Sequence, residues 1–376
     1  MSRERLNVGF VRRGFSRSGG AEAYARRLAG ALAAAGHEAT LFTTAEWPDD
    51  QWPAGRIVRV GGSEPIAFAD ELDRLEMRKH CDLVLSLERI WRCDFYRAGD
   101  GVHRAWLERR AQFDGAVQKL ARRFGRKDDA ILQLEKHLLG DGGATRMIAK
   151  YEMVRDDIVR SYGRAPETIE IVRNGVRVSN FGPAPLKREA ARARLGIAAN
   201  ETAPLFAGSG WGRKGLRYAI AAAETAGMRL LVAGRGKEHR YRSQSVQFLG
   251  EMDDLRVPLA AADIFILPTI YDPFSNASLE AMAAGLPVIT TRSNGCSEIM
   301  DEPAHGSIVN RPDDIDALAS ALRFWSDPVR RQNARPALLE RATQFDLSQN
   351  VAHMLELLLS GQPPEAAATS GKIRNT

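Results

Sequence analysis

Both halves of the chain repeat one local pattern, in which a short apolar run ends near a turn and is followed by a segment with helical periodicity. Short apolar runs that alternate with helices are typical of parallel strands joined by helical crossovers. In the first half the pattern predicts strands at residues 6–11, 39–43, 82–86, 146–149 and 169–172, and helices at 21–35 and 153–162. We therefore predict an α/β domain with a doubly wound parallel sheet in residues 1–172.

A turn-rich stretch after the last of these strands marks the predicted domain boundary. Residues 173–176 read Arg-Asn-Gly-Val, and residues 180–185 contain one glycine and two prolines, which disfavour helices and strand ladders. The strand pattern then restarts at residues 204–208, 230–234, 246–250, 264–267 and 287–291. Because 376 residues are many for one hydrophobic core, we predict a second Rossmann-like domain in residues 173–346.

Composition and cysteine usage limit the class of protein. With 44% hydrophobic and 27% charged residues, the chain has the composition of a soluble globular protein. No apolar run approaches the roughly 18 residues of a membrane span, and no apolar signal core follows Arg3 and Arg5, so we expect a cytoplasmic protein. Cys81, Cys93 and Cys296 lack pairwise spacing, which argues against a disulfide scaffold and against a structural zinc site.

Two carboxylates eight positions apart, Asp272 and Glu280, are the most informative feature for function. Asp272 falls in a predicted loop, and Glu280 falls on the first turns of a predicted helix that stops at Gly285. A helix N-terminus offers unpaired N–H groups and partial positive charge, so the amides of residues 276–278 can hold a phosphate. Glu280 would then suit the diol of a sugar or a ribose. An ordinary capped helix with incidental acids is the structural alternative.

This segment resembles the carboxylate-x7-carboxylate element of retaining GT-B glycosyltransferases of family 4 (GT4), in the branch that includes lipopolysaccharide-core glucosyltransferases. Members of the family usually have the sequence Glu-Pro-Phe-Gly where this chain has Asp272-Pro273-Phe274-Ser275, so the first acidic side chain is shorter here. The resemblance covers nearly the whole chain and implies two Rossmann-like domains that face each other across a cleft. It also implies a helix at about residues 347–360 that crosses back to the first domain. We expect the tail at 361–376 to be disordered.

Glycines and cations at strand ends supply the rest of the predicted donor site. Arg213 and Lys214 lie between glycines, where they can stabilise negative charge on a leaving diphosphate, although a solvated basic turn is the alternative. A Gly19-Gly20 turn lets a bound group approach the backbone. The donor-binding set implied by the resemblance is Gly19, Gly20, Gly208, Ser209, Arg213, Lys214, Gly234, Arg235, Leu249, Phe274, Ser275, Asn276, Ala277, Ser278, Leu279 and Glu280.

Asp100 and His103 lie in a glycine-containing stretch of the first half. Relatives carry a His or an Asp near the reacting sugar at this point, so the resemblance gives Asp100 a positioning role. An exposed loop aspartate is the alternative. The resemblance thus implies three catalytic residues, Asp100, Asp272 and Glu280, and two candidate sugar contacts, His103 and Asn174.

We predict no metal. Metal dependence in such enzymes would need an Asp-x-Asp after a strand, and Asp314-Ile-Asp316 instead precedes an apolar, helix-like run. Acidic residues in that position are typical of a helix N-terminus, where they interact favourably with its partial positive charge.

Residues 104–127 contain eight Lys or Arg against two acids, an excess equal to the net charge of +6 of the whole chain. If residues 105–125 form one helix, its apolar face and its cations would suit an anionic membrane interface. A core-packed helix with a solvated face is the alternative. The candidate membrane contacts are Trp106, Phe113, Arg122, Arg123 and Arg126. No recognition motif for nucleic acid is present, so we expect no such partner.

Taken with the resemblance, these features predict a retaining, metal-independent glycosyltransferase without a cofactor. It would move a hexose, glucose in the first instance, from a UDP-sugar to a cell-envelope glycan or glycolipid such as lipopolysaccharide core, at the inner face of the plasma membrane. Two alternatives stay open: a nucleotide-sugar epimerase of the same architecture, and a catalytically impaired protein that binds a sugar nucleotide.

Overall fold

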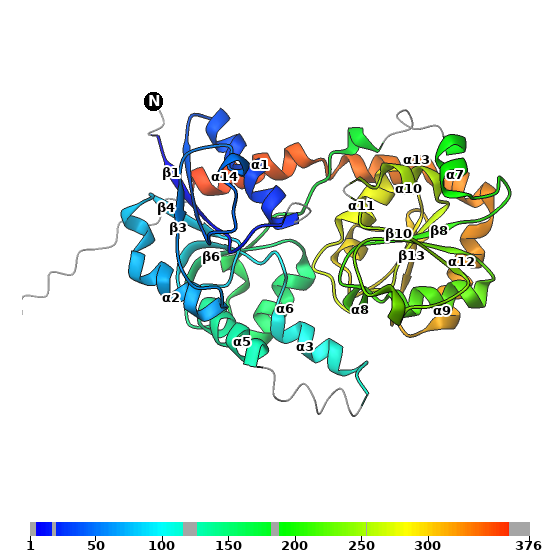
Figure 1. Ribbon diagram of the computed structural model, residues 1–376, viewed down its shortest axis with the longest axis horizontal. Helices are drawn as coiled ribbons and strands as arrows, with labels where there is room; N and C mark the ends of the chain where they lie inside the picture. The colour runs from blue at the N-terminus through cyan, green and yellow to red at the C-terminus, as the bar shows by residue number, and fades with distance from the viewer. Residues whose placement is uncertain (1–4, 17–19, 116–125, 182–187, 253, 361–376) are drawn as a thin grey trace, which may run out of the picture.

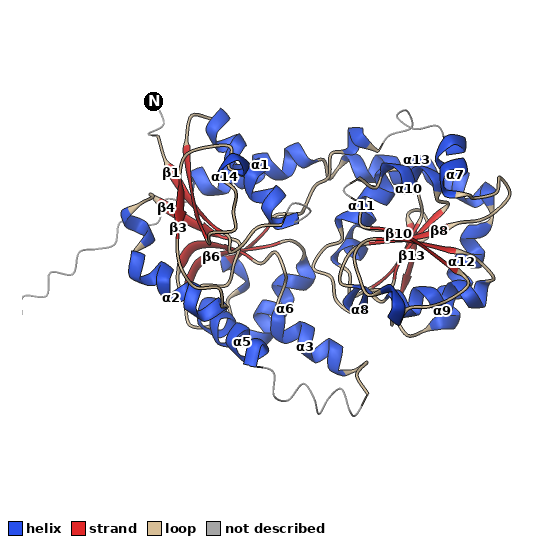
Figure 2. Ribbon diagram, in the orientation of Figure 1, coloured by secondary structure: helices blue, strands red, loops and turns tan. Residues whose placement is uncertain are grey.

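The computed structural model describes residues 5–16, 20–115, 126–181, 188–252 and 254–360, without the side chain of Arg126. They form two domains that lie side by side, each with helices on both faces of one parallel sheet (Figures 1 and 2). The first sheet has seven strands in the order β3-β2-β1-β4-β5-β6-β7, and the second has six in the order β10-β9-β8-β11-β12-β13. The prediction of two doubly wound parallel sheets is therefore confirmed.

The elements of the first domain are β1 (Asn7–Val11), α1 (Gly20–Ala34), β2 (Glu38–Thr43), β3 (Ile57–Arg59), α2 (Pro65–Leu75), β4 (Leu83–Ser86), β5 (Cys93–Arg97), α3 (His103–Ala111), α5 (Arg126–Leu139), β6 (Ala144–Ala149), α6 (Glu152–Tyr162) and β7 (Ile169–Ile171). Those that follow are α7 (Arg188–Leu195), β8 (Pro204–Ala207), α8 (Trp211–Lys214), α9 (Leu216–Ala226), β9 (Leu230–Ala233), β10 (Val246–Gly250), α10 (Arg256–Ala261), β11 (Ile264–Leu267), α11 (Asn276–Ala283), β12 (Val288–Thr291), β13 (Gly306–Val309), α12 (Ile315–Ser326), α13 (Pro328–Thr343) and α14 (Leu347–Ser360).

Strands that are buried on both faces explain the apolar runs of the sequence. Every residue of β4, β8, β9, β11 and β12 is buried, as expected for parallel strands covered by helices on both sides. Three strands, β3, β5 and β13, were not predicted, because they are short or carry polar residues such as Asp94 and Ser307. The three cysteines are buried and unpaired, which agrees with their predicted lack of a disulfide.

The hypothesis of one helix over residues 105–125, on which the membrane interpretation depends, is wrong, because α3 ends at Ala111. The chain then turns, and the ring of Phe113 packs against Tyr218 of the second domain, with 6.2 Å between the ring centroids. Arg217 also donates a hydrogen bond to the carbonyl oxygen of Phe113 (3.3 Å). These contacts between domains compete with continuation of the helix, and Gly115 further disfavours it. Residues 116–125 lie outside the described residues.

The strand order reverses between β1 and β4 in the first sheet and between β8 and β11 in the second. In open parallel sheets the crevice at such a reversal is where ligands bind. The chain passes between the domains at two neighbouring points, where the amide of Val176 donates to Phe345 (3.1 Å) and that of Leu347 to Val176 (3.0 Å). From there α14 returns to the first domain and lies beside α1 (Figure 1), with Met354 and Leu358 in the core of that domain.

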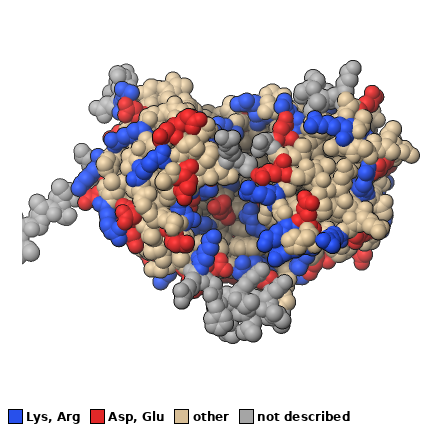
Figure 3. Space-filling model, in the orientation of Figure 1, with Lys and Arg blue, Asp and Glu red and all other residues tan. Residues whose placement is uncertain are grey.

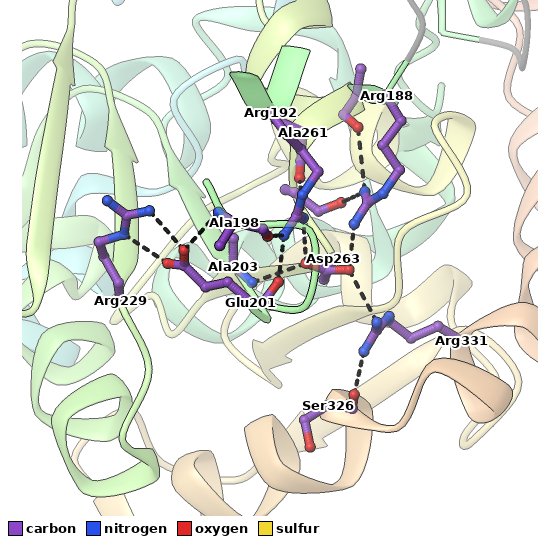
Figure 4. A network of polar contacts seen from close by, with 12 residues as sticks. Arg188, Arg192, Ala198, Glu201, Ala203, Arg229, Ala261, Asp263, Ser326 and Arg331 are labelled. Atoms are coloured by element: carbon purple, nitrogen blue, oxygen red, sulfur yellow. Dashed lines mark hydrogen bonds and ion pairs between the residues drawn. The ribbon is translucent and has the colours of Figure 1, made fainter. Parts of the chain in front are cut away.

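A buried carboxylate at the start of β11, that of Asp263, connects this strand to helices α7 and α13 of the second domain. Asp263, 5% exposed, accepts hydrogen bonds from Arg188 (2.6 Å) and Arg192 (3.0 Å) of α7, and pairs with Arg331 of α13 (3.1 Å; Figure 4). The amide of Ala203 is a fourth donor, at 2.9 Å. With this many donors on one buried carboxylate, removal of the charge would leave the guanidinium groups without a counter-ion.

We predict that Asp263→Ala lowers the free energy of unfolding by about 3–5 kcal/mol, the usual effect of removing one partner of a buried ion pair. The matched control is Asp301→Ala, because Asp301 pairs with Arg341 while 67% of its side chain is exposed. An exposed pair contributes at most about 1 kcal/mol. Chemical denaturation measures both variants, and similar losses in the two would contradict a special role for Asp263.

Candidate active site

A cavity of about 500 Å³ lies between the domains, within the usual size range of a small-molecule site. Figure 3 shows the molecule hollowed there, with acidic and basic side chains in the hollow. The carboxyl ends of β1, β5 and β6 line it from the first domain, and those of β8 and β9, with the loop before α11, line it from the second. The predicted residues that it brings together are Gly20, Asp100, Asn174, Gly208, Ser209, Arg213, Lys214, Gly234, Asp272, Phe274, Asn276 and Ala277.

The loop that carries Asp272 is held against the first domain on both sides. The hydroxyl of Tyr271 accepts a hydrogen bond from the amide of Val102 (2.9 Å). Gly101, at φ +72°, lies against Tyr271 and Pro273 so closely that a Cβ would overlap both side chains. Left-handed backbone without a Cβ is what glycine allows. This contact brings Asp100, the neighbour of Gly101, to the same cavity as Asp272.

Two further contacts support the same arrangement. The ring of Phe274 stacks on Tyr151 of the first domain, with 4.8 Å between centroids and 10° between planes. The carboxylate of Glu298 accepts hydrogen bonds from the first amides of α6, those of Glu152 (2.9 Å) and Met153 (2.7 Å). A helix N-terminus is a favourable partner for a carboxylate. The loop between β11 and α11 and the segment after β12 therefore both contact the first domain.

Asp272 forms an ion pair with Lys214. Its Oδ2 accepts a hydrogen bond from the ammonium at 2.7 Å, and its Oδ1 accepts one from the amide of Phe274 at 3.2 Å. Burial alone would raise the pKa of Asp272, but Lys214 and Arg213 together lower it below its usual value. Lys214 lies across Gly208, where a Cβ would come within 2.7 Å of its Cδ. The glycine at this strand end therefore makes room for the cation.

Helix α11 begins at Asn276 and is capped by Ser275, whose Oγ accepts a hydrogen bond from the amide of Ser278 (3.2 Å). The amide of Ser278 is used by this cap, so of the three predicted residues only Asn276 and Ala277, whose amides begin the helix, line the cavity. Two amides at a helix N-terminus still suit a phosphate.

Glu280 lines an adjoining cavity rather than the first one, together with Arg27 and Asn276, which also line the first. Burial raises the pKa of Glu280 to about 7, although Arg27 opposes the shift.

Asp100 lies opposite, on the loop after β5. Asp100 is an exposed residue, as the loop alternative expected. Desolvation by its neighbours would raise the pKa of its carboxyl, but Arg89, Arg12 and Lys150 lower it below the usual value, so it is a carboxylate. A negative charge in this position can interact with sugar hydroxyls or with a positively charged transition state.

The predicted sugar contact His103 has other partners. Its Nε2 lies 3.0 Å from Asp128, and the buried Glu135 accepts hydrogen bonds from the amides of His103 (2.7 Å) and Arg104 (3.0 Å). Burial lowers the pKa of the imidazole. His103 is not among the described residues that line the cavity.

Asn174 links the domains beside the cavity. Its Oδ1 accepts a hydrogen bond from Arg97, and its Nδ2 donates to Oδ1 of Asn276 at 2.9 Å. At the other end, Arg235 pairs with Glu251 (3.5 Å) near the surface, and Leu249 is half-buried in β10. Neither Arg235 nor Leu249 is among the described residues of the cavity wall.

Three predicted features fall partly or wholly outside the described residues. These are Gly19, the side chains of Arg122, Arg123 and Arg126, and the tail at 361–376. Two of the candidate membrane contacts are described. Phe113 packs between the domains, and the guanidinium carbon of Arg110 lies over the ring of Trp106, 5.4 Å from the ring centroid. Membrane contact by this segment therefore stays a prediction.

Sequence reasoning missed several cations of the cavity wall, notably Arg12, Arg27, Arg97 and Lys150. Lys150 directly follows the predicted strand at 146–149, so its position at a carboxyl end was a signal that could have found it. Arg97 ends β5, which the sequence did not predict.

Two features are absent from the described residues. These residues contain no group of three or more His, Cys, Asp or Glu placed to hold a metal ion, and none of their helices is long and apolar enough to cross a membrane. Asp314 caps the N-terminus of α12 by accepting a hydrogen bond from the amide of Ala317 (3.0 Å), as its sequence context predicted.

Known proteins match both domains. The family described as "Glycosyltransferase Family 4" matches residues 18–180, and the one described as "Glycosyl transferases group 1" matches residues 202–326. The chain is 24% identical to the lipopolysaccharide glucosyltransferase WaaG of Escherichia coli K12, over 91% of this chain and 96% of the relative. It is 26% identical to a D-inositol 3-phosphate glycosyltransferase of an Arthrobacter species, over 90% and 89%.

Solved structures show the same fold. A crystal structure of WaaG matches with a TM-score of 0.77 at 23% identity, and covers 94% of this chain and all of that one. The structure of Anabaena Alr3699/HepE in complex with UDP-glucose matches with a TM-score of 0.71 at 17% identity, over 95% and 100%. Together with the two family matches, these findings show that the chain is a GT-B glycosyltransferase of family 4.

Proposed function

We propose that this glycosyltransferase moves a hexose, glucose in the first instance, from a UDP-sugar to a glycan or glycolipid acceptor, with retention of anomeric configuration and without a metal. The observation that carries the proposal is the convergence of Arg213, Lys214 and the first amides of α11 on one cavity, with Asp100 opposite. Cations beside a helix N-terminus suit a diphosphate.

The diphosphate leaves as negative charge develops on it, and Arg213 and Lys214 would stabilise that charge in place of a metal ion. Lys214 is paired with Asp272 before any donor binds. A diphosphate would compete for the same ammonium and so release Asp272 toward the hydroxyls of the sugar. Glu280, one turn along α11, would accept hydrogen bonds from the ribose diol once it is deprotonated.

Retention requires the acceptor to approach the face of the sugar from which the diphosphate departs. In this proposal the leaving diphosphate lies along the second domain, and Asp100 holds the sugar from the first. The acceptor would then enter along the first-domain side of the cavity, past Arg12 and Arg97. The names of the WaaG and HepE relatives, which mention lipopolysaccharide and UDP-glucose, support this choice of donor and acceptor class.

The proposal is tested by incubating the protein with UDP-glucose and truncated lipopolysaccharide core, and by measuring product with NMR. Retention predicts an α-linked glucose from the α-linked donor. A β-linked product would contradict retention, and release of free sugar nucleotide derivatives without transfer would favour an epimerase. Binding of UDP-glucose with neither transfer nor hydrolysis would favour a catalytically impaired binding protein.

We predict that Lys214→Ala and Arg213→Ala each lower kcat by roughly a hundredfold or more, the usual effect of removing one group that stabilises the developing charge. The matched control is Lys79→Ala, because Lys79 pairs with Glu76 while 69% of its side chain is exposed. The control should transfer sugar at the normal rate. Near-normal kcat in both cavity variants would reject the assignment of the diphosphate.

Asp272→Ala should separate donor binding from transfer. The variant loses a sugar contact, so we expect kcat to fall at least about tenfold. It also loses the carboxylate that competes with the diphosphate for Lys214, so we expect an unchanged or lower Kd for UDP. Calorimetry and initial rates give the two quantities. Asp272→Glu tests whether the shorter acidic side chain at this position matters for the rate. An unaltered rate in both variants would show that Asp272 is not part of the site.

A further inference from the structure

Lys150 is a cation of the cavity wall to which the proposed mechanism gives no role. It follows directly after β6, at the carboxyl end of the first sheet, and lines the cavity opposite Arg213 of the second domain. Two other cations in the wall have acidic partners: Arg12 pairs with Glu22 (3.0 Å) and Glu88 (2.7 Å), and Lys214 pairs with Asp272. Within the described part of the chain, the structure shows no hydrogen bond or ion pair for the side chains of Lys150 and Arg213, nor for that of Arg27, which lines the adjoining cavity as well.

The surroundings of Lys150 do not satisfy its charge. Burial and the charges of Arg97 on β5 and Arg213 on α8 together lower the pKa of its ammonium to about 7, against the opposing effect of Asp100 and Asp272. A cation in this position is unfavourable without an anionic partner. Two unpaired cations that face each other from opposite domains would both be stabilised by one anion placed between them.

A phosphate fits this position better than an anionic sugar would. The sugar end of the cavity carries the two carboxylates Asp100 and Asp272, whose charges would repel a carboxylate on the transferred sugar. The diphosphate of a sugar nucleotide instead carries its negative charge beside Arg213 and Lys214. An ammonium can donate up to three hydrogen bonds to such oxygens.

We propose that Lys150 is a third cation of the diphosphate site and donates a hydrogen bond from the first domain to a phosphate oxygen of the bound donor. The inference rests on the proposed function and extends it to a residue of the opposite domain. The donor would then be held from both sides of the cavity, and its binding would strengthen the contact between the domains.

Proton uptake follows from the same arrangement. At pH 8 part of the Lys150 population is neutral in the empty cavity, and the diphosphate favours the charged form. Binding of the donor should therefore draw a proton from the buffer. An arginine at this position would already be charged, so it would take up none.

The test is titration calorimetry with uridine, UDP and UDP-glucose at pH 8, in Tris and in HEPES, on the wild-type protein, Lys150→Met and Lys150→Arg. We expect Lys150→Met to weaken UDP and UDP-glucose by about tenfold or more, the effect of one lost charged hydrogen bond, and to leave uridine unchanged. Wild type should take up a fraction of a proton with UDP-glucose, and Lys150→Arg should take up measurably less. Glu280 is present in both proteins, so its own titration cancels in the comparison.

Each other outcome overturns the assignment in a distinguishable way. An unchanged affinity of Lys150→Met for UDP would show that Lys150 does not contact the diphosphate. Weaker binding of UDP-glucose alone would show that Lys150 contacts the sugar instead. Lys150 would be a structural residue if Lys150→Met weakened uridine as much as UDP, or lowered the midpoint of thermal unfolding, and if wild type and Lys150→Arg also took up the same number of protons. A wild-type protein that binds none of the three ligands would overturn the proposed donor as well.

Discussion

The contact between Gly101 and the Tyr271–Pro273 loop is the constraint on which the site depends. Neither domain holds a complete set of polar groups, because Asp100 comes from one and Asp272 from the other. The hydrogen bond from Val102 to Tyr271 joins positions 169 residues apart in the chain, and the glycine allows the two backbones to meet without a side chain between them. The two carboxylates therefore face one cavity.

Within that cavity, opposite charges are partly paired and partly left open. The pair between Lys214 and Asp272 is neutral before the donor binds, whereas Arg213 and Lys150 have no side-chain partner among the described residues. An anion that enters between Arg213 and Lys150 would find two unpaired cations, and beside them Lys214, which can exchange partners. This arrangement favours a diphosphate over a neutral ligand, since the gain from an anion is largest where cations are enclosed and unpaired.

The sequence predicted what depends on local pattern. The apolar runs located most strands, and Ser275 and Gly285 located α11, so the spacing of Asp272 and Glu280 placed one in a loop and the other on a helix. Lys214 was found through its flanking glycines. Contacts distant in sequence decided the rest: Glu135 and Asp128 occupy the surroundings of His103, and Phe113 leaves its helix to meet Tyr218. No local pattern shows which side chains of the opposite domain will be near.

The most direct test of this account is the transfer rate of Gly101→Ala compared with Gly227→Ala. Both glycines have nearly the same backbone strain, at φ +72° and +71°, but a Cβ meets Tyr271 and Pro273 at Gly101 and open space at Gly227. If the domains must meet at Gly101, its variant should lose most of its transfer activity while UDP still binds the second domain, and the control should lose little. Similar rates in the two variants would contradict the claim that this contact assembles the site.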